Sequence, residues 1–299
     1  MHGWIILDKP LGLGSTQGVS AVKRVLRQGG YGKGIKVGHG GTLDPLATGV
    51  LPIAVGEATK LAGRMLDSDK VYDFTIRFGE QTSTLDAEGE VVTASDVRPT
   101  RDALEAVLPG FTGPIEQVPP AYSALKIDGE RAYDLARAGE EVVLASRAVT
   151  IHALTVQEGA ADGALEEITL TAHVSKGTYI RSLARDIALA LGTVGHVTML
   201  RRIKAGPFTL APAISLDKLN EMGQARTLEQ ILLPLRAGLD DIPALALDPD
   251  QAGALRQGRV LAGIAVDDGQ YFAMLGDTPV ALVEALEGNV RVVRGFNLD

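Results

Sequence analysis

The stretch from Gly38 to Gly49 constrains the fold most, because it places one carboxylate in a glycine-dense loop directly before an apolar run. Asp44 is followed by Pro45, and the apolar run covers residues 50–55. Glycine permits positive φ and a close approach to another molecule, and proline fixes the chain just past the acid. Stiff loops between ordered segments often carry binding and catalytic groups. Taken alone, the stretch is nevertheless more typical of a tight turn capped by Asp44.

The composition is that of an ordinary globular protein. With 299 residues, 45% of them hydrophobic and 22% charged, the chain can form one large domain plus a smaller one. The first apolar run ends at Asp8, and no run approaches the length of a membrane span. There is no cysteine, and the five histidines show no paired spacing. We therefore expect a cytoplasmic protein with no membrane partner and no dedicated zinc site.

The charge is unevenly distributed along the chain. The net charge is −8, yet residues 1–70 carry nine Lys or Arg against five Asp or Glu. Residues 176–204 carry six basic side chains against Asp186 alone. Phosphate binding depends on local potential more than on total charge, so two basic patches leave room for a nucleic-acid partner. Without a motif to join them, solvated surface charge is the better explanation of these patches.

The periodicity of apolar residues predicts strands interleaved with helices at uneven spacing, which favours an α+β fold. Strands are predicted near residues 3–8, 50–55, 71–78, 142–157, 165–175 and 197–203. Helices are predicted over residues 17–27 with Thr16 as N-cap, over 57–66, after an N-cap at Thr100, from an N-cap at Thr178 to 191, and near 227–233. Residues 28–36, rich in glycine and lysine, are expected to form a mobile basic loop. The short strand-like runs in the last fifty residues predict a small β-rich domain.

Six collinear segments resemble the TruB family, the tRNA pseudouridine-55 synthases. They are GWIILDKPLG (3–12), VGHGGTLDPLATGVLPIAVGEATK (37–60), SDKVYDF (68–74), VPPAYSALKIDGERAYDLAR (118–137), HVSKGTYIRSLARDIALALG (173–192) and HVTMLRR (196–202). A lone GTLDP would be a weak signal, but several blocks in the family's order are specific. The resemblance departs from the usual pattern at Gly40, where Thr is common, and at Gly14, where Ser or Thr is common.

The resemblance implies a fold, a reaction and a substrate. The fold would be an α+β catalytic domain with a mixed sheet over residues 1–238, followed by a small PUA-like RNA-binding domain over 239–299. The reaction would detach uracil 55 in the T stem-loop of tRNA from its ribose and rejoin it through carbon 5. The base would be flipped out of its stack, with an aromatic face replacing the lost stacking. The resemblance implies no metal and no organic cofactor, and nothing in the sequence demands more than a monomer.

The resemblance also assigns roles to individual residues. Asp44 would be the nucleophile, Tyr72 would pack on the base and assist proton removal, and Arg181 would pair with the catalytic carboxylate. His39, Tyr72, Tyr179 and Leu200 would bind the flipped nucleotide. The residues expected to contact RNA are Lys9, Lys126, Lys176, Arg201 and Arg202. Each has a plain alternative, since such side chains are commonly core, turn or surface residues.

Three questions stay open from the sequence. Asp44 could attack the base or the ribose. The chain could instead be chiefly an RNA-binding or RNA-folding protein whose isomerase chemistry is secondary or lost. A carboxylate-based glycosidase would need a second acid opposite Asp44, and none is near it in the sequence.

Overall fold

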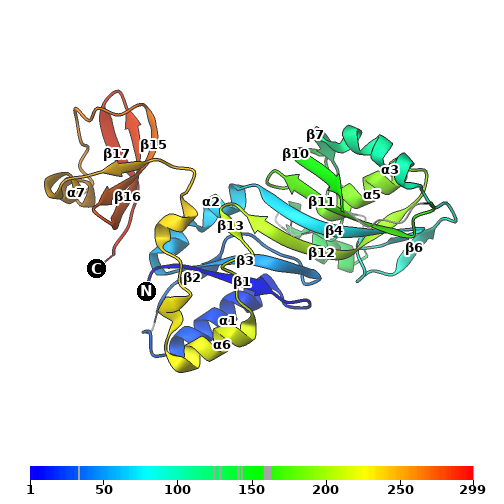
Figure 1. Cartoon of the computed structure of the whole chain (residues 1–299), viewed down its shortest axis with the longest axis horizontal. Helices are drawn as coiled ribbons and strands as arrows, with labels where there is room; N and C mark the ends of the chain where they lie inside the picture. The colour runs from blue at the N-terminus through cyan, green and yellow to red at the C-terminus, as the bar shows by residue number, and fades with distance from the viewer. Residues whose placement is uncertain are drawn as a thin grey trace.

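The computed structural model describes residues 1–32, 34–123, 125–127, 130–139, 142, 144–157 and 163–298. Figure 1 shows a large body built on one long sheet and a smaller β-rich body formed by the last part of the chain. None of the helices in the described ranges has the length and apolarity needed to cross a membrane.

The large body is organised on a nine-stranded mixed sheet, which confirms the predicted α+β class. Its main path runs β1-β3-β12-β4-β11-β10-β7, with β2 and β13 added at the side. Strand β12 pairs parallel with β3 and antiparallel with β4, so it joins the two halves of the sheet. The strands are β1 Gly3–Lys9, β2 Val37–His39, β3 Ala47–Val55, β4 Lys70–Phe78, β7 Gly113–Gln117, β10 Arg147–Val156, β11 Glu167–Val174, β12 Gly195–Ala205 and β13 Phe208–Thr209.

Helices cover the two halves of the sheet separately. Helices α1 (Ser15–Gln28) and α6 (Leu216–Ala225) lie side by side against the β1–β3 half, whereas α5 (Ile180–Ala190) packs on β12 and β4 (Figure 1). The shorter helical segments are η1 Gly56–Leu61, α2 Ala62–Asp67, α3 Arg101–Val107, η2 Leu108–Phe111, α4 Ala132–Arg137, η3 Leu228–Gln230 and η4 Leu235–Gly238. Two small ribbons, β5 (Glu80–Thr82) with β6 (Val91–Ala94) and β8 (Lys126–Ile127) with β9 (Glu130–Arg131), complete the large body.

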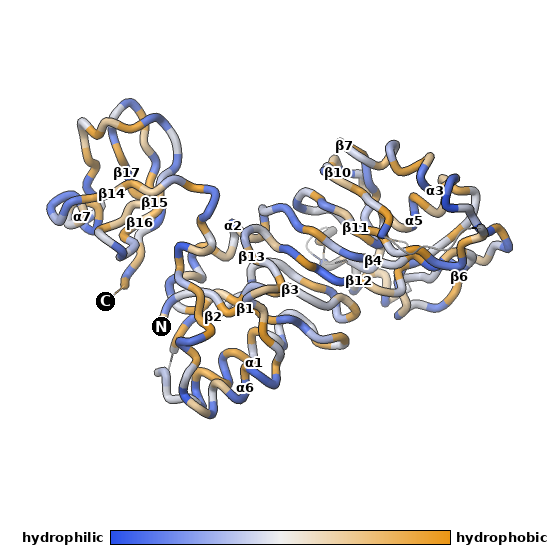
Figure 2. Tube along the Cα trace, in the orientation of Figure 1, coloured by the Kyte–Doolittle hydropathy of each residue, from blue (hydrophilic) through white to orange (hydrophobic). Residues whose placement is uncertain are grey.

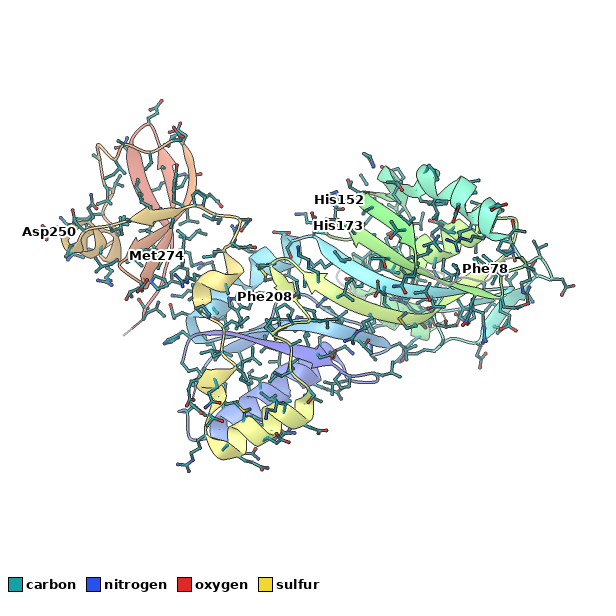
Figure 3. All side chains as sticks on the ribbon, in the orientation of Figure 1. Phe78, His152, His173, Phe208, Asp250 and Met274 are labelled. Atoms are coloured by element: carbon teal, nitrogen blue, oxygen red, sulfur yellow. The ribbon has the colours of Figure 1, made fainter. Side chains whose placement is uncertain are left out.

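The hydrophobic pattern explains most of these elements. In β4, Phe74, Ile76 and Phe78 alternate with more polar residues and are buried, as their spacing predicts. Phe78 lies within the half of the core under α5 (Figure 3). Ile180, Leu183, Ala184 and Ile187 recur at helical spacing and are buried, so they form the apolar stripe of α5.

Two predicted caps and one predicted helix are wrong. Thr16 lies inside α1, whose N-cap is Gly14, and Thr178 precedes Tyr179, the N-cap of α5. The helix predicted near 227–233 is only the short turn η3, and the longer helix α6 was not predicted. Thr100, by contrast, caps α3 as predicted, since its side chain accepts a hydrogen bond from the Ala103 amide.

The smaller body holds a four-stranded sheet with its own core. The order is β14-β15-β16-β17, and α7 packs against β16 and β17. Figure 2 shows apolar residues running along the strands of both bodies. The elements are β14 Ala244–Ala246, α7 Pro249–Arg256, β15 Gly269–Leu275, β16 Thr278–Leu286 and β17 Asn289–Gly295. The predicted small β-rich domain is therefore confirmed as a structure.

Buried side chains and hydrogen bonds join the two bodies. One core cluster contains Trp4 and Phe208 from the large sheet together with Met274 from β15 (Figure 3). The Lys60 ammonium donates to the Gly295 carbonyl at 2.9 Å. Lys60 belongs to η1, which follows strand β3 directly.

Candidate functional site

A pocket of about 190 Å³ lies where the Asp44 loop, β4, β12 and the start of α5 meet. The structure brings five of the predicted site residues into its lining, namely Asp44, Tyr72, Tyr179, Arg181 and Leu200. Among the described residues of the lining, Asp44 is the only acid. The small volume suits one planar ring better than a large ligand.

Asp44 forms an ion pair with Arg181. A carboxylate oxygen of Asp44 lies 3.0 Å from Nη2 of Arg181, and the Asp44 side chain is 45% exposed. The Arg181 side chain is only 8% exposed and donates to the carbonyls of Thr84 and Tyr122, each at 3.0 Å. The arginine is therefore held by fixed backbone acceptors and presents its remaining face to Asp44, which orients the carboxylate toward the pocket.

Asp86 is a second acid at this arginine, and sequence reasoning missed it. Its carboxylate lies 3.7 Å from Nη1 of Arg181, and its side chain is 8% exposed. It also accepts hydrogen bonds from the Thr84 hydroxyl and the Glu88 amide. The only sequence signal was an acidic loop between Gly79 and Gly89, which does not indicate which carboxylate turns inward. Asp86 balances the buried charge of Arg181 at Nη1, whereas Asp44 pairs with Nη2.

Tyr179 is held in place by a buried amide that sequence reasoning also missed. The Gln117 side chain, 1% exposed as a residue, accepts from the Tyr179 amide at 2.8 Å and donates to its carbonyl at 3.1 Å. Burial raises the pKa of the Tyr179 hydroxyl above its ordinary value. Tyr179 is therefore a neutral, rigid ring on the pocket wall.

Tyr72 and Leu200 form the apolar part of the wall. Both are half-buried and pack against the cores of both halves of the sheet. Leu200 on β12 lies opposite Phe74 of β4 and Ala47 of β3, so it sits where the two halves join. A planar ring entering the pocket would contact these two side chains and Tyr179.

The prediction that Lys9 and Arg202 contact RNA is contradicted, because both residues are buried. Lys9 is 0% exposed, and its ammonium donates to the carbonyls of Pro10, Leu13 and Pro45 at 3.2, 2.6 and 3.3 Å. Burial lowers the pKa of Lys9 from 10.5 to about 8, against the opposing effect of the Asp44 charge.

Arg202 supports the same loop from another side. It is 1% exposed and donates to the carbonyls of Val50, Thr42 and Gly41 at 2.8, 3.3 and 3.1 Å. Buried backbone carbonyls need such donors because burial removes their water. Lys9 and Arg202 thus bind the loop backbone on both sides of Asp44 and have no exposed surface for phosphate.

The glycines of the Asp44 loop make room for protein atoms. A Cβ at Gly49, where φ is +102°, would lie 2.2 Å from the Arg202 carbonyl oxygen. A Cβ at Gly40 would lie 2.6 Å from Cβ of Met65. The departure from Thr at position 40 therefore fits the packing of Met65. These two glycines allow the loop to lie close against β12 and α2.

His39 does not line the pocket. It ends β2 opposite Ile53, and its buried Nδ1 has no hydrogen-bond partner among the described residues. Burial, followed by the charge of Arg202, lowers its pKa below 6.5. A nucleotide role for His39 stays a prediction, and in this structure it is a neutral histidine beside the loop.

The other predicted RNA contacts differ in exposure. The Arg201 guanidinium is bidentate to Asp8 at 2.9 Å for each bond, and its side chain is 33% exposed. The Lys176 side chain is 63% exposed and pairs with Asp67 at 2.9 Å. Lys126 lies in β8, and its side chain is outside the part of the chain that the structure describes.

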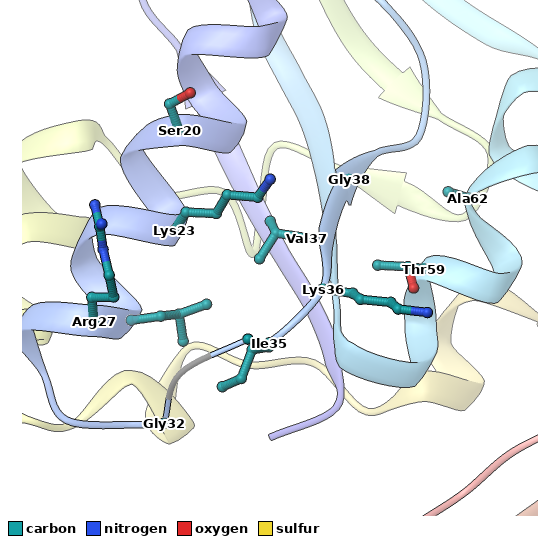
Figure 4. A pocket seen from close by; sticks show the side chains of 12 residues that line it. Ser20, Lys23, Arg27, Gly32, Ile35, Lys36, Val37, Gly38, Thr59 and Ala62 are labelled. Atoms are coloured by element: carbon teal, nitrogen blue, oxygen red, sulfur yellow. The ribbon is translucent and has the colours of Figure 1, made fainter.

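A second pocket, of about 740 Å³, lies away from Asp44 between α1, the 28–36 loop, β2 and η1. Figure 4 shows Lys23, Arg27 and Lys36 around it. Among its described lining residues there is no acid. Three of the nine basic residues counted over residues 1–70 therefore gather here and not at Asp44.

Two family models match the chain. The model of the TruB family pseudouridylate synthase N-terminal domain matches residues 23–180, and that of the tRNA pseudouridylate synthase B C-terminal domain matches residues 181–240. The second range includes α5, β12 and α6, which belong to the large body.

Curated relatives are similar over the full length. The chain is 70% identical over 299 residues to the tRNA pseudouridine synthase B of Novosphingobium aromaticivorans, covering 100% of this chain and 98% of the relative. It is 61% identical over 297 residues to that of Zymomonas mobilis subsp. mobilis, covering 99% and 96%.

Solved structures support the fold. The crystal structure of a Cbf5-Nop10-Gar1 complex matches with a TM-score of 0.71 and 27% identity over 95% of this chain and 78% of that chain. An H/ACA RNP bound to a substrate RNA containing 2′-deoxyuridine matches with a TM-score of 0.74 at 24% identity, over 99% and 85%.

Proposed function

The chain belongs to the TruB family of pseudouridylate synthases, and from this premise we propose that it converts uridine 55 in the T stem-loop of tRNA to pseudouridine, with Asp44 as nucleophile. The observation that carries the proposal is the 3.0 Å ion pair between Asp44 and Arg181 at a pocket whose lining includes two tyrosines and two leucines. The reaction breaks the bond from N1 of uracil to the ribose and forms one from C5. The proton lost from C5 is balanced by one gained at N1.

Each wall of the pocket has a function in this scheme. Tyr72, Tyr179 and Leu200 offer rings and apolar surface to an extruded uracil, which replaces the stacking lost on flipping. Arg181 fixes the Asp44 carboxylate so that an oxygen faces the bound nucleotide. Asp86 and the carbonyls of Thr84 and Tyr122 hold Arg181 in turn. Tyr72 on the pocket wall is the proposed group for proton removal.

Two other functions receive less support. A glycosidase needs a second carboxylate opposite Asp44, and the described lining of the pocket has no other acid. A protein that only binds or folds RNA would not need a half-exposed carboxylate paired with a buried arginine, because such an acid repels phosphate.

The substitution Asp44→Asn tests the nucleophile with little change in shape. We expect pseudouridine formation in a T stem-loop transcript to fall by about a thousandfold or more, because an amide is a poor nucleophile. RNA binding, measured by filter retention, should stay within about threefold of wild type. The matched control is Asp217→Asn, an exposed acid in the first turn of α6, which should keep full turnover. Equal turnover by Asp44→Asn and wild type would refute the assignment, and product at another uridine would refute the site specificity.

We also propose that residues 1–238 and 239–299 act as separate domains, the first catalytic and the second binding RNA. The separate sheets support this division, as does a core cluster that lies wholly within the smaller body, although a second cluster is shared by the two bodies. Together the two family matches extend from residue 23 to residue 240. The RNA-binding role of the small body therefore rests on the sequence resemblance.

A further inference from the structure

Three potential metal ligands converge on the large body, away from the Asp44 pocket. Nε2 of His152 lies 3.1 Å and Nε2 of His173 lies 3.7 Å from the same carboxylate oxygen of Asp69. All three ligand atoms lie within 4.8 Å of one another, and the two imidazole centroids are 4.7 Å apart. Figure 3 shows the two histidines on neighbouring strands at one end of the sheet.

The sheet explains how residues far apart in sequence meet here. His173 on β11 lies opposite Val71 of β4 and Ala153 of β10. Asp69 directly precedes β4 and is two residues from Val71, so it shares the face of His173. The pairing of β10 with β11 shifts register between Ile151 and Ala153, which makes His152 the bulged residue, and a bulge re-aims its side chain.

The spacing suits a tetrahedral ion. Zinc bonds of about 2.0 to 2.1 Å to nitrogen and oxygen place neighbouring ligand atoms about 3.3 Å apart. The two measured distances to Asp69 lie on either side of that value. We propose that Asp69, His152 and His173 bind a divalent transition metal of the zinc class, with the fourth position open to solvent. Two imidazoles and one carboxylate favour such ions over Mg²⁺ or Ca²⁺, which prefer all-oxygen sites.

The surroundings leave these ligands free for an ion. Asp69 and His173 line a hollow of about 530 Å³ that also contains other charged groups. Asp67 is paired with Lys176, and Asp241 is paired with Arg64. The remaining charged groups of that lining are Asp240 and Lys204.

The ion would tie strands together and take no part in the isomerisation. Its ligands come from the residue before β4, from β10 and from β11, and none lines the Asp44 pocket. Tyr72 follows Val71 on β4, so its side chain points to the other face of the sheet. The histidines show no paired spacing in the sequence, yet the fold brings His152 and His173 side by side.

Titration of untagged, chelator-treated protein with zinc sulfate tests the site. We expect one equivalent to bind with a Kd of about 10 μM or tighter, and His152→Ala or His173→Ala to weaken binding at least about tenfold. Cobalt(II) should give the visible absorption of a tetrahedral ion in wild type and not in the double variant. With zinc about 100-fold above Kd, the wild-type Tm should rise by about 5 °C.

The control is His2→Ala, because His2 accepts from the Glu57 amide and lies outside the cluster. This variant should bind zinc as wild type does, and both alanine variants of the cluster should retain pseudouridine formation. Absence of zinc binding by wild type would overturn the proposal and leave only ion pairs to Asp69. Unchanged zinc binding by the His152→Ala/His173→Ala double variant would place the ion elsewhere and would equally overturn it.

Discussion

Two groups of basic residues look alike in the sequence and differ in the structure. Lys9 and Arg202 are fully buried, and their donors go to backbone carbonyls around Asp44. Lys176 and Arg201 keep exposed surface and pair with acids, Asp67 and Asp8. Arg201 and Arg202 are adjacent in the chain and still belong to different groups, because successive strand residues point to opposite faces of the sheet.

The difference shows what the positive charge near the Asp44 pocket does. A buried cation that satisfies several carbonyls fixes a loop that has no regular hydrogen-bonding pattern of its own. An exposed cation can attract phosphate, and its ion pair contributes little to stability. The glycine-rich loop is therefore rigid because of the side chains beneath it. Substitutions in the two groups should have separable effects on stability and on RNA binding.

The substitution Arg202→Met should have the largest effect. It leaves carbonyls of Val50, Thr42 and Gly41 without their donor, so we expect a loss of about 3 kcal/mol or more in the free energy of unfolding. Urea unfolding measures this, and pseudouridine formation should fall with the loosened loop. The control Arg201→Met should cost about 1 kcal/mol or less, because its pair with Asp8 is partly exposed. Equal losses in the two variants would show that burial does not separate these groups.

The substitution Lys9→Met should have a smaller effect that depends on pH. The cost is expected to be about 1–3 kcal/mol at pH 7, from three carbonyls that lose a donor. In wild type, the folded-state pKa of Lys9 is about 8 against an ordinary 10.5. Between these values the unfolded chain holds a proton that the folded chain lacks, so this group makes stability rise with pH.

Urea unfolding at pH 8 and pH 10 separates Lys9 from the other titrating groups. The rise in stability between these pH values should be smaller in Lys9→Met than in wild type. Burial also lowers the pKa of Lys70 to about 8, and Lys70 therefore contributes equally to the rise in stability of both proteins. An identical rise in the two proteins would mean that Lys9 is not desolvated in solution.

Much of the fold, and less of the site, could be predicted from the sequence. The strand predicted near 71–78 and the helix predicted to end at 191 rest on local patterns, namely the alternation in β4 and the apolar stripe of α5. Both elements are confirmed. Helix α6 was missed because its segment is polar and only a few of its residues, among them Leu219 and Met222, are buried. Its end at Arg226, with φ of +56°, has no glycine to mark it.

The missed parts of the site depend on contacts between distant segments. Asp86 meets Arg181, and Gln117 meets Tyr179, across 62 or more positions of the chain. No local pattern distinguishes Asp86 from the other acids of its loop. The burial of Lys9 follows from where the Pro45 carbonyl lies in three dimensions, and the sequence holds no sign of that.

The substitution Lys176→Ala should have the smallest effect on stability and a selective one on RNA. Its ion pair with Asp67 is exposed on both sides, so unfolding should change by less than about 0.5 kcal/mol. If Lys176 contacts one phosphate, the slope of log affinity against log salt should fall by about 0.9. The matched control is Lys218→Ala, an exposed lysine paired with Glu221 on α6, which should leave the slope unchanged. Equal slopes for wild type and Lys176→Ala would remove Lys176 from the RNA surface and leave Arg201 as the exposed cation to test next.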